Sequence, residues 1–98
     1  MVELHSEYTD RLVQVILSLE NEEQCYALFE DLCTVKEVKE MSQRLEVARL
    51  LSQGMSYQKV SEITNASSTT ISRVKRCLDY GSGGYERALK ELEAEHEQ

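Results

Sequence analysis

Proline is absent from this 98-residue sequence, and glycine is scarce. The four glycines all lie in its second half, at Gly54, Gly81, Gly83 and Gly84. Because proline and glycine are the residues that most often interrupt helices, we expect long helices with few, sharp breaks between them. The sequence therefore predicts an all-α fold of about six helices.

Cysteine and histidine are too few and too scattered to indicate a site. Cys25, Cys33 and Cys77 include no CxxC pair and leave an odd thiol, which argues against a disulfide framework or a zinc site. We expect all three to be small packing residues in a reducing compartment. His5 and His96 lie near the two ends without ligand-like neighbours. No metal site and no cofactor is predicted.

Patterns typical of enzymes and of membrane proteins are missing as well. No acid–base pair, nucleophile constellation or phosphate-binding loop stands out, so the sequence does not predict an enzyme. No apolar run approaches the ~20 residues that a membrane-spanning helix needs, and no charged-plus-apolar leader opens the chain. We expect a soluble, cytoplasmic protein without a membrane partner.

The length and the glycine positions predict one small domain in three parts. An apolar content of 41% suffices for one modest core. We expect residues 1–53 to form a helical frame and residues 54–80 a helix-turn-helix. Residues 81–98 are expected to form a glycine-rich break followed by either a packed helix or a fraying tail.

Apolar spacing and capping signals divide the frame into three helices. The first is predicted over about residues 4–20, with an apolar face made by Tyr8, Leu12, Val15, Ile16 and Leu19. Asn21 with Gln24, and Thr34 with Glu37, have the spacing of a capping box and predict the next two helix starts. Gly54 is expected to end the third helix. The second and third helices also carry apolar stripes, made by Cys25, Leu28, Phe29 and Leu32 and by Val38, Met41, Leu45, Ala48 and Leu51.

Two shorter helices are predicted after Gly54. Ser56 is expected to cap the first, which ends near Thr64, and Ser67 or Ser68 the second, which ends before Gly81. Asn65 lies between them and suits a turn that needs positive φ, because its short side chain tolerates the left-handed region. The inward positions are predicted to be Val60, Ile63, Ile71, Val74 and Leu78, with the small Ser61 where the two helices approach and the small apolar Ala66 leading into the second helix. A short helix, a tight turn and a second, basic helix are typical of a DNA-binding helix-turn-helix.

Charge is concentrated in the same segment. The chain has a formal net charge of −7. Residues 1–53 contain five basic and eleven acidic residues, and residues 79–98 contain two and six. Residues 54–78, by contrast, contain four basic residues and one acidic residue, a net charge of +3. This segment is the one that would attract an anionic partner, and the acidic remainder would limit non-specific binding.

The side chains that face outward on the second short helix are candidate DNA contacts. A recognition helix enters the major groove by its N-terminal end, so base contacts are predicted for Ser68, Thr69, Thr70 and Arg73. Phosphate contacts are predicted for Ser56, Gln58, Lys59, Ser72, Lys75 and Arg76. The same hydroxyls could instead be ordinary caps, and the basic residues a solvated face.

The segment "MSQRLEVARLLSQGMSYQKVSEITNASSTTISRVKRCL" resembles the tryptophan-repressor superfamily, and in particular its YerC/YecD-type members. The shared features are Leu50-Leu51 at a helix end, Met55-Ser56 after a short link, and Thr70-Ile71-Ser72-Arg73 in the second short helix. The resemblance covers roughly residues 33–80. It implies an all-helical, intertwined homodimer whose N-terminal helices form the dimerisation frame, with two recognition helices in successive major grooves.

The resemblance also implies a ligand site, from which this sequence departs. In the tryptophan repressor the corepressor lies between two arginines beside a glycine. Arg73 matches one arginine, Gln43 stands at the other position with Arg44 next to it, and Val74 replaces the glycine. The ligand candidates are thus Arg73, Arg44 and Gln43. A branched side chain at position 74 is expected to fill the indole space, so tryptophan is not expected as corepressor, and no other small-molecule effector is specified.

The sequence as a whole predicts a sequence-specific regulator of transcription that binds double-stranded DNA. We expect a repressor that acts as a homodimer on a pseudo-palindromic operator. The alternative is a helical adaptor that uses the helix-turn-helix fold to bind another protein without binding DNA.

Overall fold

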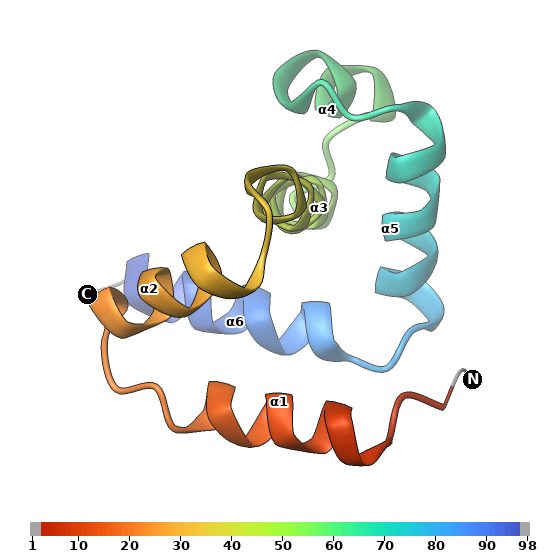
Figure 1. Ribbon diagram of the computed structural model, residues 1–98. Coiled ribbons are helices and arrows are strands. Elements are labelled where there is room, and N and C mark those ends of the chain that lie inside the picture. Colours follow the sequence, from red (N-terminus) through yellow and green to blue (C-terminus); the bar gives the residue numbers. More distant parts are fainter. Residues whose placement is uncertain (1–2, 97–98) are drawn as a thin grey trace. The chain divides into compact units, whose positions relative to one another are not determined.

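The computed structural model describes residues 3–96, which form six helices (Figure 1). They are α1 (Glu7–Leu17), α2 (Glu22–Leu32), α3 (Val35–Ser52), α4 (Tyr57–Thr64), α5 (Ser68–Tyr80) and α6 (Gly84–His96). The predicted all-α fold of about six helices is confirmed. None of the described helices is both long and apolar enough to cross a lipid bilayer.

The chain divides into two compact units, and the boundary between them falls within α3. The first is Met1–Val38 and the second Lys39–Gln98. The first unit therefore contains α1, α2 and the first turn of α3, and the second contains the remainder of α3 with α4, α5 and α6.

Helix α1 is shorter than the predicted span of residues 4–20. Ser6 has extended backbone angles and accepts a hydrogen bond from the Thr9 N–H at 3.1 Å, so the helix begins after it. At the other end, the Ser18 and Leu19 N–H groups donate to carbonyls three residues back. This tighter turn ends α1 at Leu17.

The predicted caps of α2 and α3 are present. The Asn21 side chain accepts from the Gln24 N–H at 2.9 Å, although the Gln24 side chain bonds the Glu20 N–H instead of completing a box with Asn21. Thr34 and Glu37 form the complete capping box, with reciprocal hydrogen bonds of 2.8 and 3.1 Å. These local bonds fix where both helices start.

The first unit has apolar faces but no buried side chain in its described residues. On the predicted face of α1, the side chains of Leu12, Val15 and Ile16 are 40%, 46% and 42% exposed. Tyr8 on the same face is 81% exposed. The amphipathic pattern is therefore present on α1, and its apolar face remains exposed among the described residues.

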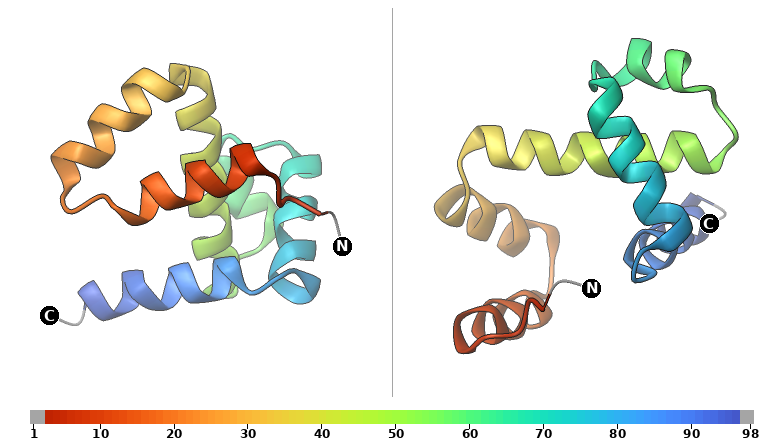
Figure 2. Two further views of the ribbon diagram at one scale, coloured as in Figure 1. Left: turned by 60° about the horizontal axis from the view of Figure 1, so that its bottom comes forward. Right: turned by 90° about the vertical axis from the view of Figure 1, so that its right-hand side faces the viewer.

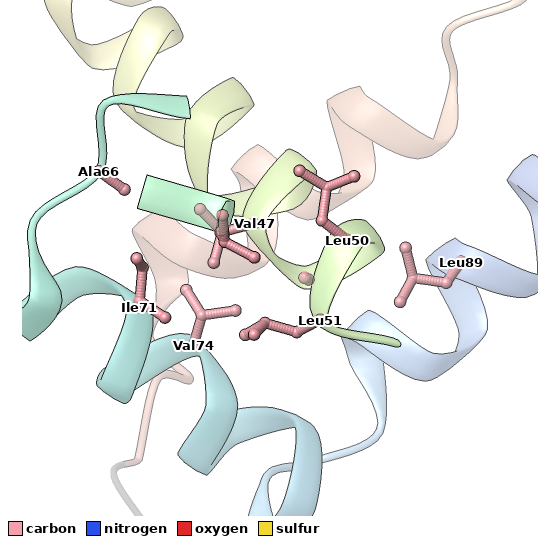
Figure 3. Close-up of a cluster of buried hydrophobic side chains, with 9 residues drawn as sticks. Val47, Leu50, Leu51, Ala66, Ile71, Val74 and Leu89 are labelled. Atoms are coloured by element: carbon pink, nitrogen blue, oxygen red, sulfur yellow. The ribbon is translucent and has the colours of Figure 1, made fainter. Parts of the chain in front are cut away.

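The second unit has a hydrophobic core (Figure 3). Helix α3 contributes Val47, Ala48, Leu50 and Leu51, and α4 contributes Val60. The turn adds Ala66, α5 adds Ile71 and Val74, and α6 adds Leu89. Helix α5 runs across α3: Figure 1 shows α3 end-on with α5 lengthwise beside it, and Figure 2 (right) shows α5 crossing in front of α3. The core thus joins the helix-turn-helix to α3.

Two of these core residues were not on the predicted stripe of α3. Ala48 and Leu51 are buried as expected, whereas Met41 and Leu45 remain 40% and 36% exposed. Val47 and Leu50 are instead almost fully buried, at 0% and 4%. The reason is that the last two turns of α3 are surrounded by several helices, so more than one of their faces is covered.

Glycine ends α3 as predicted. Gly54 has φ +85°, which an L side chain rarely adopts. Its N–H donates to the Leu51 carbonyl, and the Met55 N–H donates to the Leu50 carbonyl. This pair of bonds is a Schellman motif, and Met55 packs against the core beside it. The motif turns the chain so that α4 can return over α3.

The residues after the glycine-rich break form a packed helix. In α6, Leu89 is 8% exposed and Tyr85 packs against the same core. Of the two alternatives left open for this segment, the structure therefore has the packed helix. Cys77 differs from its expected packing role, because it is exposed, whereas Cys25 and Cys33 are partly buried.

Candidate nucleic-acid interface

Helices α4 and α5 form a helix-turn-helix whose ends are fixed by capping residues. Ser56 accepts from the Lys59 N–H at 3.2 Å, and Ser67 accepts from the Thr70 N–H at 3.1 Å. Ser67, not Ser68, is thus the cap of α5. Asn65 has φ 61° and ψ 15°, the left-handed conformation predicted for the turn. The two predicted helix caps and the predicted left-handed turn are therefore all present.

The inward face of the unit differs from the prediction at one position. Val60 is fully buried, but Ile63 is 50% exposed. The half-buried residues of α4 are Ser61 and Thr64, which lie on the other side of Val60 around the helix axis. Because position 63 falls about 60° outside this arc, a two-turn helix presents Ile63 to solvent.

Side-chain hydrogen bonds hold the turn between α4 and α5. The Ser61 hydroxyl donates to the Ala66 carbonyl at 3.0 Å. The Thr64 hydroxyl donates to the Val60 carbonyl at 2.8 Å and accepts from the Ala66 N–H at 3.2 Å. The Gln43 amide of α3 donates to the Thr64 carbonyl at 3.0 Å. Two of these four bonds therefore tie α4 to Ala66 in the turn, one lies within α4, and one ties α3 to the last residue of α4.

The predicted base-contacting residues lie on the N-terminal half of α5. Ser68, Thr69 and Arg73 are exposed, while Thr70 is partly buried. The Thr70 hydroxyl lies 3.1 Å from that of the capping Ser67. Three of the four side chains are thus exposed, and the fourth lies within hydrogen-bond distance of the cap.

The predicted phosphate-contacting residues are on both helices. Ser56, Gln58, Lys59, Ser72 and Arg76 are exposed, and Lys75 is partly buried. Lys59 lies 3.9 Å from Glu62, and Lys75 lies 3.3 Å from Asp79. Arg73 and Arg76 have no ion pair within the part of the chain that the structure describes. The Lys75–Asp79 pair could have been found from its spacing of four residues on a helix.

A pocket of about 230 Å³ adjoins α5. It is lined by residues of α3, α5 and α6: Arg44, Thr70, Arg73, Val74, Cys77 and Tyr85. Two of the three predicted ligand candidates, Arg44 and Arg73, therefore meet here, while Gln43 is not among the lining residues. Tyr85 was not among the predicted ligand candidates, because this residue follows the glycine-rich break and belongs to no motif.

Val74, which is expected to fill the indole space, is among the residues that line this pocket. Its side chain is 2% exposed and points toward Ile71 and Leu51 in the core (Figure 3). It forms one wall of the pocket, so that a cavity remains beside it.

A left-handed turn between two capped helices, packed on a longer helix, defines a helix-turn-helix protein with an all-helical frame. The Trp repressor protein family matches residues 7–93. The chain belongs to the Trp repressor family.

Individual relatives agree with this assignment. The chain is 52% identical over 95 residues to the uncharacterized protein YerC of Bacillus subtilis (strain 168), covering 94% of this chain and 91% of that protein. A crystal structure of a proposed Trp repressor from Staphylococcus aureus matches with a TM-score of 0.87 and 44% identity, over 92% of this chain and 90% of that one. A TrpR-like protein from Eubacterium eligens ATCC 27750 matches with a TM-score of 0.86 and 44% identity, over 91% and 92%.

Proposed function

We propose that the protein is a sequence-specific transcriptional regulator, a repressor that binds double-stranded DNA as a homodimer. The observation that carries the proposal is the outward face of α5, where hydroxyl side chains precede two arginines without acidic partners in the described residues. This face belongs to the one net-positive segment of an acidic chain. Membership of the Trp repressor family supports a DNA-binding, non-enzymatic regulator.

The base contacts are assigned to the first half of α5. Ser68 and Thr69 can donate to or accept from base edges, and the Thr69 methyl group can contact thymine. Arg73 is exposed one turn later and can form a bidentate pair with guanine. Thr70 is assigned to the same edge, although its hydroxyl is close enough to Ser67 to share a hydrogen bond.

The phosphate contacts are assigned to residues around the two helix starts and on the flank of α5. Lys59 and Arg76 supply positive charge, and Ser56, Gln58 and Ser72 supply neutral donors. Lys75 must release or share Asp79, which lies 3.3 Å away, when it engages a phosphate. These contacts fix the register of the protein on DNA without distinguishing its sequence.

The apolar surface of the first unit supports the homodimer. Leu12, Val15 and Ile16 form a row on α1 that remains 40–46% exposed in one chain. Contiguous exposed apolar surface of this kind usually marks a protein–protein interface. A second copy supplies the same row, and a two-fold interface buries like against like. A symmetric dimer would place two copies of α5 about one helical turn of DNA apart.

Tryptophan is not part of this proposal. The resemblance implies a second arginine at position 43, but the Gln43 amide there bonds the Thr64 carbonyl and does not line the pocket. The branched Val74 takes the place of a glycine at the pocket wall. Isothermal titration calorimetry tests this point: no heat of binding is expected with micromolar tryptophan, and saturable binding in that range would contradict the proposal.

Selection of bound fragments from a random pool of duplex DNA tests the proposed function. We expect enrichment of a two-fold symmetric consensus with half-sites ~10 bp apart, since each recognition helix would occupy one major groove. A consensus without symmetry would contradict the dimeric arrangement. No retention of any duplex at ~50 mM salt would contradict DNA binding altogether and favour the adaptor alternative. A cytoplasmic location is part of this proposal.

A further inference from the structure

Gln43 links α3 to the end of α4 across a separation of 21 residues. Its Nε2 donates to the Thr64 carbonyl at 3.0 Å, and the bond is partly buried. Thr64 is the last residue of α4, and the carbonyls in the last turn of a helix have no partner within the helix. The Gln43 amide therefore satisfies an acceptor that would otherwise need water, and it does so from the scaffold helix.

The side-chain bonds of Thr64 and Ser61 extend this link to the start of α5. The Thr64 hydroxyl accepts from the Ala66 N–H, and the Ser61 hydroxyl donates to the Ala66 carbonyl. Ala66 is 2% exposed and directly precedes Ser67, the cap of α5. Hydrogen bonds thus connect α3 to Thr64 and Thr64 to Ala66, which lies two residues before the start of α5 at Ser68.

Apolar packing alone does not fix the position and rotation of the turn relative to α3. Val47, Val60 and Ile71 bury α4 and α5 against α3, but apolar contacts are not directional. A hydrogen bond constrains both distance and angle, so it resists sliding and rotation of the turn. The side-chain bonds described for residues 49–70 join residues no more than five positions apart and cannot relate the turn to α3.

We infer that Gln43 is a positioning residue, which sets the orientation of α5 relative to α3 for specific DNA binding. The inference rests on the proposed function, and it describes how α5 can be oriented without a bound small molecule. A recognition helix that is already oriented loses less conformational freedom on binding, so operator affinity rises without any new contact to DNA. Contacts to phosphates tolerate a small rotation of α5, whereas contacts to base edges do not.

Gln43→Met tests the inference, because methionine keeps the length of the side chain and removes the donor. Gln53→Met is the matched control, since Gln53 is exposed at the end of α3 and makes no described side-chain bond. We expect operator affinity to fall about threefold to tenfold in Gln43→Met, as for the loss of one hydrogen bond. Affinity for random duplex and its dependence on salt should stay unchanged, as should both affinities in Gln53→Met.

Amide hydrogen exchange supplies a readout that does not depend on DNA. The Ala66 N–H should exchange faster by a similar factor in Gln43→Met, while the amides in the middle of α5 stay protected. Gln43→Leu also lacks the donor and should give the same faster exchange at Ala66. Agreement of the two variants separates loss of the hydrogen bond from an effect that is specific to methionine. Unchanged exchange at Ala66 in both variants would overturn the inference.

The DNA measurements separate failure of the inference from failure of the proposed function. If the unsubstituted protein retains no duplex, the proposed function fails, and the specific role of Gln43 fails with it. If the unsubstituted protein binds its operator but Gln43→Met binds equally well, only the positioning role is overturned. Equal losses on operator and random duplex would also overturn it, since they indicate general destabilisation.

Discussion

Residues 3–38 and residues 39–96 both contain amphipathic helices, yet they differ in burial. The first group has no buried side chain, whereas the second contains all nine buried hydrophobic residues of the described chain. Helical periodicity predicts which face of a helix avoids water, but it does not tell what covers that face. The second unit buries part of its apolar surface in a core of its own, whereas the first leaves its apolar faces exposed.

The largest expected effect tests the core of the second unit. Ile71→Ala should lower the free energy of unfolding by about 2–5 kcal/mol, because Ile71 is 1% exposed and its truncation leaves a cavity. Ile63→Ala is the matched control in the same helix-turn-helix and should cost less than about 1 kcal/mol, since Ile63 is 50% exposed. Urea unfolding at one fixed protein concentration measures both. Equal losses would contradict the burial difference between the two isoleucines.

The next effect tests the first unit. Ile16→Glu places a charge in the apolar row of α1 and should raise the dissociation constant of the proposed dimer about 100-fold or more. Gln14→Glu introduces the same charge on the opposite side of α1 and should leave association unchanged. Sedimentation velocity over a range of concentrations measures both. A monomeric unsubstituted protein, or an unaltered Ile16→Glu dimer, would count against the interface.

A third comparison, within α5, is between a proposed base contact, Arg73, and a proposed phosphate contact, Lys75. Arg73→Ala should cost ~1–3 kcal/mol and relax selection at one base position. Lys75→Ala should weaken binding to all sequences and reduce the salt slope by about one. Arg87→Ala on α6 removes the same charge away from the proposed interface and serves as the control. Binding to operator variants at several salt concentrations measures these effects, and identical specificity profiles for the first two variants would remove their assigned roles.

The features that sequence analysis found correctly depend on a few neighbouring residues. The caps at Asn21 and Ser56, the capping box at Thr34 and the turns at Gly54 and Asn65 are all set by local backbone geometry. A short polar side chain before a helix, or a residue that tolerates positive φ, acts in the same way in many folds. Such signals could therefore be recognised without knowing what the helices pack against.

The features that were not predicted from the sequence depend on residues far apart in the chain. The burial of Val47 and Leu50 follows from the helices around α3, and the exposure of Ile63 follows from which side of α4 faces the core. Tyr85 reaches the pocket only because α6 folds back after the glycines. The Gln43–Thr64 bond joins α3 to α4 and has no signature in either helix. Periodicity along one helix contains none of this information.

A smaller effect tests the turn of the second unit. Asn65 has φ 61°, so Asn65→Ala should cost about 1 kcal/mol, because alanine is strained in the left-handed region and asparagine is less so. Asn65→Gly should be close to neutral, since glycine adopts this conformation freely. Urea unfolding distinguishes them. An alanine variant as stable as the glycine variant would mean that the turn can relax to negative φ.

The smallest effect concerns acid and the start of α3, in the first unit. The pKa of Glu37 is lowered from 4.5, chiefly because its carboxylate accepts a hydrogen bond from the Thr34 N–H, and secondarily through the Thr34 hydroxyl. Since the folded-state pKa lies below that of the unfolded chain, the carboxylate stabilises the fold above the unfolded value. This contribution is lost as the pH falls through the folded-state pKa.

NMR titration of the Glu37 carboxyl carbon measures this shift. We expect a midpoint below 4.5 in the unsubstituted protein, and a midpoint closer to 4.5 in Thr34→Ala, which keeps the N–H donor but loses the hydroxyl. The first amides of α3 should exchange faster as Glu37 becomes protonated, because the capping box then opens. The core amides of α5 should not follow, since Ile71 and Val74 contain no titratable group and belong to the other unit. A midpoint at or above 4.5, or a simultaneous loss of protection in α5, would contradict a local origin of the shift.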